Sequence, residues 1–179
     1  MGKLSLRLAL FLAALLAAGQ APAQGASELQ VKAAYLYQFG GFVEWPPRAF
    51  AGPDGVFSIG VVGADAMAAE LERIVATRQI QGRQVAVRRL RPGEPLQGLQ
   101  VLFVGAGEAA RLPEILSPAY AAPLLVVTES DGALAQGGVI NFVVADNRVR
   151  FDVALPQAER RQLRISSRLL GVARRVVQG

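Results

Sequence analysis

Four acidic residues follow predicted strands and are the candidates for catalysis or ligand binding. Asp65, Glu108, Glu129 and Asp131 each follow an apolar run that predicts a strand. Because the carboxyl ends of parallel strands meet at one edge of a sheet, these carboxylates could gather there. Each is more simply explained as a helix cap or a turn residue, and the sequence defines no acid–base pair. We therefore assign none of them a catalytic role.

Two glycine-rich turns are predicted at the same edge. Residues 60–63 (GVVG) and 105–107 (GAG) lie between a predicted strand and a helix, where open α/β sheets bind ligands. Neither is a complete dinucleotide fingerprint or a P-loop, and glycines are expected in any tight turn. If a small ligand binds, we expect the site to use Gly63, Asp65 and Gly105.

The chain contains neither histidine nor cysteine. This removes the commonest general base and the commonest metal ligand, and it leaves no disulfide to stabilise the fold. Ser130, Ser166 and Ser167 have no histidine partner and no nucleophile-elbow spacing. We therefore expect no catalytic residues, no metal site and no cofactor, which indicates that the protein is not an enzyme.

Binding chemistry is better represented, in the stretch KAAYLYQFGGFVEWP (32–46), which contains the only tryptophan. Gly40 and Gly41 end a helical pattern, and Pro46 prevents a second helix from starting before it. The short segment between them predicts a partner-binding corner, because tryptophan is enriched in binding hot spots. Its alternative role is to cover the core. The candidate residues are Phe42, Glu44, Trp45 and Pro46.

Arginines are concentrated near the C-terminus, where we predict a final helix over residues 157–177. At helical spacing they form a basic stripe that could contact an acidic partner or a phosphate. A solvated helix face is the alternative. We select Arg164 and Arg168 as partner-binding candidates and expect no nucleic acid in an exported protein. The stripe comprises Arg161, Arg164, Arg168 and Arg175.

The first residues predict a secretory signal peptide over residues 1–23. Lys3 and Arg7 precede the apolar run 8–18, and Ala23 ends a small-residue cleavage motif. Cleavage after Ala26 is the alternative. No other stretch reaches the length of a membrane span, so we expect a periplasmic mature chain without membrane insertion. Residues 27–179 are predicted to form one domain.

Apolar strands alternate with helices along the mature chain, which predicts an α/β fold. We expect a three-layer α/β/α sandwich with a mostly parallel central sheet, a C-terminal antiparallel hairpin and the final helix. The predicted strands cover residues 56–62, 85–90, 101–104 and 124–128, and the predicted helices cover 28–39, 66–76 and a segment ending at Leu116.

The hairpin is predicted in register because Asp146 and Asn147 are suited to a tight primed turn. This turn places all six apolar residues of the two strands on one face. A slip by one residue would expose the whole apolar set. The predicted pairs are Val144 with Val149, Phe142 with Phe151 and Ile140 with Val153.

In order and spacing, several segments resemble the YfiR family of small periplasmic proteins. They are KAAYLYQFGGFVEWP (32–46), FSIGVVG (57–63), GRQVAVRRL (82–90), VLFVG (101–105), GGVINFV (137–143), VRFDV (149–153) and LRISSRLLGVA (163–173). The resemblance implies an α/β sandwich, often a homodimer, without catalytic activity.

The resemblance also implies a partner, the periplasmic domain of an inner-membrane diguanylate cyclase that is held inactive. Release under envelope or redox stress would raise cyclic-di-GMP and promote biofilm formation. Thiol-based sensing cannot operate here, because this chain has no cysteine. The alternative is a sensor of a nucleotide or an aromatic amino acid that acts with a membrane receptor or a sensor kinase.

Overall fold

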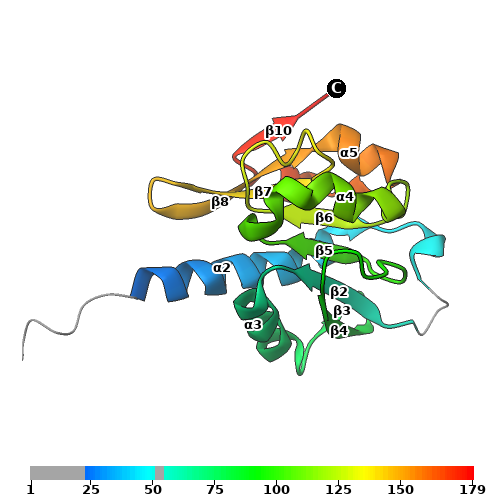
Figure 1. Cartoon of the computed structure of the whole chain (residues 1–179), viewed down its shortest axis with the longest axis horizontal. Coiled ribbons are helices and arrows are strands. Elements are labelled where there is room, and N and C mark those ends of the chain that lie inside the picture. The colour runs from blue at the N-terminus through cyan, green and yellow to red at the C-terminus, as the bar shows by residue number, and fades with distance from the viewer. Residues whose placement is uncertain (1–22, 51–54) are drawn as a thin grey trace, which may run out of the picture.

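The computed structural model describes residues 23–50 and 55–179 (Figure 1). The predicted signal peptide, apart from Ala23, lies outside the described residues, so it stays a prediction. Among the helices in the described part of the chain, none is both long and apolar enough to cross a membrane.

A mostly parallel sheet forms the centre of the molecule, with eight strands within the described residues, in the order β10-β8-β7-β6-β5-β2-β4-β3. Strands β4, β2, β5, β6 and β7 are parallel neighbours, whereas β8 is antiparallel to β7 and β3 is antiparallel to β4. The predicted α/β class is confirmed. The strands are β2 (Phe57–Val62), β3 (Gln79–Ile80), β4 (Arg83–Leu90), β5 (Val101–Val104), β6 (Leu125–Thr128), β7 (Ile140–Ala145), β8 (Arg148–Ala154) and β10 (Arg175–Val177).

Helices cover both faces of this sheet (Figure 1). Helices α2 (Ala23–Phe39) and α3 (Asp65–Val75) pack against each other on one face, and α4 (Leu112–Leu116) and α5 (Leu155–Arg160) lie on the other. Right-handed crossovers explain this division, since β4 and β5 lie on opposite sides of β2. Short 3-10 helices complete the connections: Gly40–Phe42, Pro47–Ala49, Ala106–Arg111 and Ser117–Ala119.

The first described helix is held to the sheet by aromatic packing. Phe39 is fully buried, with its ring centroid 5.0 Å from Phe151 and 5.6 Å from Phe142. Tyr35, one turn earlier, lies edge-on to Phe151 at 5.6 Å. Burying each such ring contributes roughly 1.5–3 kcal/mol, so this cluster fixes the position of α2.

The hairpin β7–β8 has the predicted register, with Phe142 opposite Phe151 and Val144 opposite Val149. Asp146 and Asn147 have φ values of 52° and 55°, as a primed turn requires. The shared apolar face is buried at the base of the hairpin, whereas Val144 near the turn is 54% exposed. The tip of the hairpin therefore projects from the body of the sheet (Figure 1).

The predicted final helix over residues 157–177 is wrong. The segment instead forms α5, β9 (Arg164–Ile165), α6 (Ser167–Leu170) and β10. Gln162 has φ 57°, which ends α5, and the Ser166 side chain accepts a hydrogen bond from the Arg168 backbone N–H at the start of α6. Pairing of β9 and β10 with distant strands replaces the helical hydrogen bonds that the apolar periodicity predicted.

Candidate functional site

A small antiparallel ribbon brings the two predicted partner-binding segments together. Strand β1 (Val43–Glu44) pairs with β9, so that Val43 lies opposite Ile165 and Glu44 lies opposite Arg164. The Ser166 N–H extends the ribbon by donating to the Phe42 carbonyl oxygen at 2.9 Å. The aromatic corner and the arginine-rich segment thus form one surface, although they lie near opposite ends of the mature chain.

The charged side chains of this ribbon are open to solvent. The Glu44 and Arg164 side chains are 77% and 87% exposed, with 3.9 Å between Glu44 Oε2 and Arg164 Nη1. An exposed pair of this kind contributes only about 0–1 kcal/mol to folding, so both groups are available to a partner at little cost. Arg168 is also exposed and lies on α6, directly after the ribbon.

The predicted basic stripe does not exist, because its helix does not form. Arg164 and Arg168 remain close in the chain on β9 and α6. Arg161 is instead buried, and Arg175 lies on β10 with its Nη2 2.9 Å from an oxygen of Asp152. Two of the four arginines therefore lie at the ribbon surface, and the other two lie elsewhere in the fold.

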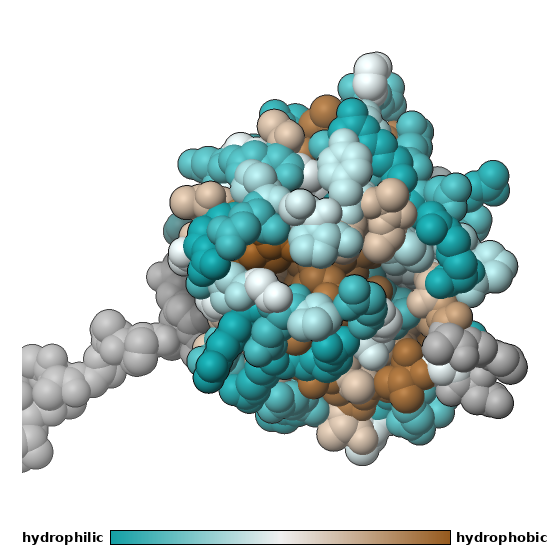
Figure 2. Space-filling view, turned by 45° about the vertical axis from the view of Figure 1, so that its right-hand side comes forward, coloured by the Kyte–Doolittle hydropathy of each residue, from teal (hydrophilic) through white to brown (hydrophobic). Residues whose placement is uncertain are grey.

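Trp45 follows the ribbon and is partly buried. Its indole N–H donates to the Gly40 carbonyl oxygen at 3.1 Å, and its ring lies edge-on to Phe57 at 5.6 Å and to Phe50 at 6.5 Å. Pro46, also partly buried, turns the chain away from the ribbon. Trp45 therefore contributes to the core, and its role as a binding hot spot stays a prediction. Figure 2 brings the side that carries the amino end of β2 forward and shows apolar areas between polar side chains.

The glycines predicted for a ligand site lie at the opposite, carboxyl end of the sheet. Gly63 has φ 67° and follows β2, and the Gly105 N–H donates to the Val62 carbonyl oxygen at 2.9 Å. A β-carbon on Gly105 would lie 2.6 Å from the Gly63 carbonyl oxygen. Close backbone approach therefore explains both glycines. Their position between β2 and β5 is nevertheless the topological switch point at which α/β sheets bind ligands.

A cavity of about 420 Å³ opens beside this switch point. Gly63 lines the cavity, whereas Gly105 and Asp65 do not. Asp65 is exposed and is the first residue of α3, with Ala64 at the cap position and no side-chain cap bond, so its predicted capping role is wrong. Other lining residues include Lys32, Phe103, Ala106 and Glu129.

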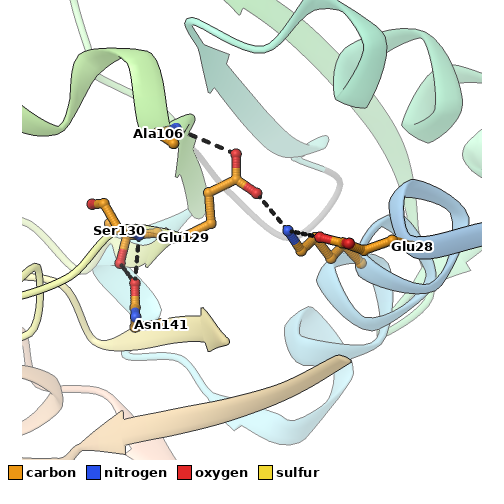
Figure 3. A network of polar contacts seen from close by, with 7 residues as sticks. Glu28, Ala106, Glu129, Ser130 and Asn141 are labelled. Atoms are coloured by element: carbon orange, nitrogen blue, oxygen red, sulfur yellow. Dashed lines mark hydrogen bonds and ion pairs between the residues drawn. The ribbon is translucent and has the colours of Figure 1, made fainter. Parts of the chain in front are cut away.

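Lys32 lines this cavity and places a positive charge between the carboxylates of Glu28 and Glu129. Figure 3 labels these two carboxylate residues and marks their ion pairs with dashed lines. Lys32 Nζ lies 2.6 Å from Glu28 Oε1 and 2.9 Å from Glu129 Oε2, and only 12% of the lysine side chain is exposed. Burial alone would lower the pKa of Lys32, but the hydrogen bonds to Glu28 and Glu129 raise it above the ordinary value of 10.5. The ion pair therefore fastens α2 to the end of β6.

The backbone around Glu129 is positioned by further polar contacts (Figure 3). The Ala106 N–H donates to Glu129 Oε1 at 3.3 Å, and the Ser130 N–H donates to Asn141 Oδ1 at 3.1 Å. Asn141 is buried and also accepts a hydrogen bond from the Thr128 hydroxyl at 2.7 Å. Adjacent strand ends and the turn after β5 thus hold the Glu129 carboxylate toward α2.

The predicted gathering of carboxylates is only partly correct. Glu129 lines the cavity, and Glu108 lies against Gly63, but Asp131 lines a separate pocket with Asp152. Sequence reasoning missed Lys32 as a site residue. A signal was present, since Lys32 is the only lysine after the predicted signal peptide and Glu28 precedes it by one helical turn.

Comparison with known families tests the resemblance independently of this geometry. Residues 29–174 match the family model described as YfiR/HmsC-like. The chain belongs to the YfiR/HmsC-like family. Proteins of this family are periplasmic regulators rather than enzymes. The comparison with curated proteins found no match.

Proposed function

We propose that the mature chain is a periplasmic regulator that represses an inner-membrane diguanylate cyclase by binding its periplasmic domain. Repression would keep cyclic-di-GMP low and restrain biofilm formation. Family membership supports this function, and the ribbon β1–β9 is the observation that supports a binding surface. Two segments selected separately for partner binding lie side by side in that ribbon.

The chemistry of the ribbon suits recognition of another protein. It presents one carboxylate, Glu44, and two guanidinium groups, Arg164 and Arg168, in exposed positions. Exposed charges set the rate and specificity of association more than they stabilise the monomer. Phe42 and Trp45 flank strand β1 in the chain and are partly buried against the core, so the parts of their rings that stay exposed would supply apolar contact area. An interface with an apolar centre and a charged rim is the usual arrangement between proteins.

The test is genetic and uses point variants of the full-length chain. In a strain that carries the cyclase, deleting the gene should raise cyclic-di-GMP, and expressing the wild-type protein should lower it again. Arg164→Glu should fail to restore repression. Arg148→Glu is the matched control, because Arg148 is exposed at the start of β8 and lies off the ribbon. Unchanged cyclic-di-GMP after deletion contradicts the cyclase assignment.

We also propose that the protein is a homodimer, as the family resemblance implies. Light scattering of the purified mature chain at several concentrations tests this separately from repression. A monomeric mass at concentrations above those of the periplasm would contradict it.

The second candidate is a small-ligand sensor that acts with a membrane receptor or a sensor kinase. The cavity beside Gly63 favours it, since its volume suits a small molecule and it lies at the switch point. Calorimetry with nucleotides and aromatic amino acids distinguishes the two functions. A protein-binding module should give no heat with either class, whereas Lys32→Met should remove a heat that arises in this cavity.

A further inference from the structure

Arg161 is a buried cation with no acidic partner among the residues that the structure describes. The residue is 2% exposed, and within the described residues its guanidinium donates a single hydrogen bond, from Nη1 to the Ala119 carbonyl oxygen at 2.7 Å. A guanidinium carries several further N–H donors. Burial lowers the pKa of Arg161 below its ordinary value, and among the charged or titratable neighbours only the Tyr120 phenol opposes this shift. Buried charges are normally paired, so a bound anion would stabilise this guanidinium.

Arg161 also lies in the wall of a cavity. Every fully buried side-chain nitrogen in the described part of the chain has a hydrogen-bond partner, so the unused nitrogens of Arg161 are those open to solvent. Arg161 lines a cavity of about 290 Å³ between α4, the loop before β7 and the end of α5. No lining residue is acidic: the lining comprises Pro113, Leu116, Ser117, Tyr120, Gln136, Gly137 and Arg161.

The other lining groups fit an anion that carries a flat apolar part. Ser117 and Gln136 supply a hydroxyl and an amide as additional hydrogen-bond donors. Pro113 and Leu116 supply an apolar wall, and the Tyr120 ring is 61% exposed beside them. Arg160 Nη1 lies 3.3 Å from the Tyr120 hydroxyl, which adds a second positive charge at the rim.

We propose that this cavity is a binding site for a small organic anion, with Arg161 holding its carboxylate or phosphate head. The guanidinium fork matches both head groups geometrically, and desolvation strengthens the charge-assisted bonds. The apolar part of the ligand would lie against Pro113, Leu116 and Tyr120. The site lies on the α4 and α5 face of the sheet, away from the cavity beside Lys32, and it does not depend on the proposed regulatory function.

The test is calorimetric titration of the mature protein with three probes: inorganic phosphate, phenyl phosphate and benzoate. Phenyl phosphate or benzoate should bind more tightly than inorganic phosphate, because only they contact the apolar wall. Their relative affinities decide between a phosphate and a carboxylate head. Arg161→Met should weaken binding about 10- to 100-fold, the loss expected when charge-assisted hydrogen bonds are removed.

Two further variants keep the proposal testable if Arg161→Met does not fold. Tyr120→Ala removes an exposed ring and should weaken the aromatic probes while sparing inorganic phosphate. Arg148→Ala, far from the cavity on β8, is the control and should bind all probes as the wild type does. Equal binding by a folded Arg161→Met, equal binding of the aromatic probes by Tyr120→Ala, or no binding of any probe at millimolar concentration, overturns the proposal.

Discussion

Gly105 lies so close to Gly63 that a β-carbon at position 105 would come 2.6 Å from the Gly63 carbonyl oxygen. The obstacle is backbone and cannot move aside as a flexible side chain would. The two turns that follow β2 and β5 therefore touch at their glycines, and this contact sets the shape of the switch point. Its consequences can be measured directly.

Gly105→Ala should destabilise the protein by about 1–3 kcal/mol, the range for forced overpacking. Gly107→Ala is the matched control, because a β-carbon there meets nothing within 4 Å. We expect it to be neutral or to stabilise by up to about 1 kcal/mol through a less flexible unfolded chain. Urea unfolding of both variants gives the comparison, and equal stabilities would contradict the close contact.

Lys32→Met should destabilise the protein by about 1–2 kcal/mol, since it leaves Glu129 without its cation, although solvent screening reduces the value of the pair. The pKa of Lys32 is raised in the folded state above 10.5. Its contribution is therefore fully present below that pH and is lost as the pH rises through the folded-state pKa.

Unfolding curves at neutral and strongly alkaline pH measure this dependence for the ion pair. The stability difference between wild type and Lys32→Met should shrink only at the alkaline end. A difference that already disappears at neutral pH would show that the ion pair does not hold α2. Glu114→Gln is a suitable control, because Glu114 pairs with Arg111 on the exposed surface of α4.

Removing both arginines that pair with Asp152 should destabilise the protein more than removing the charge of Asp152 itself. The Asp152 side chain is 2% exposed and accepts a hydrogen bond from Arg174 Nε at 2.8 Å, with Arg175 Nη2 at 2.9 Å. Replacing both arginines with Met leaves a buried carboxylate unpaired, whereas Asp152→Asn leaves two arginines that solvent can reach. The double Met variant should therefore have the lower urea midpoint, and the opposite order would contradict this assignment.

Trp45→Ala should destabilise the protein by about 2–4 kcal/mol, at or below the range for a fully buried Trp because the ring is only partly buried. Trp45→Phe keeps most of the ring packing and loses one hydrogen bond, at a cost of about 1 kcal/mol. If Trp45 is also a hot spot, Trp45→Phe should fold normally and bind the partner domain more weakly. If a folded Trp45→Phe variant binds the partner domain with unchanged affinity, the role of Trp45 is limited to core packing.

Charge reversal on the ribbon separates binding from folding. Glu44→Arg and Arg164→Glu should each change thermal stability little, since the pair is exposed. The double variant restores the ion pair with reversed polarity and should still fail to bind a partner that recognises the original charges. Surface plasmon resonance against the periplasmic domain of the cyclase measures this binding. Normal binding by the double variant would show that the ribbon is not part of the interface.

Much of the central sheet could be predicted from sequence because its signals are local. Continuous apolar runs such as Val101–Val104 identify strands buried on both faces, and such strands are typical of a parallel sheet covered by helices. The β7–β8 register was also predictable, because Asp146 and Asn147 define the turn and a slip would expose the apolar face.

The candidate site depended on contacts that no local pattern contains. The last segment has helical periodicity, but β9 pairs with β1, near the other end of the mature chain, and β10 pairs with β8. Only that pairing placed Glu44 opposite Arg164 and buried Arg161 beside a cavity. Sequence by itself determined the apolar central strands and the β7–β8 hairpin, because burial follows residue type. Tertiary structure decided which charges meet, because backbone pairing between distant segments brings them together.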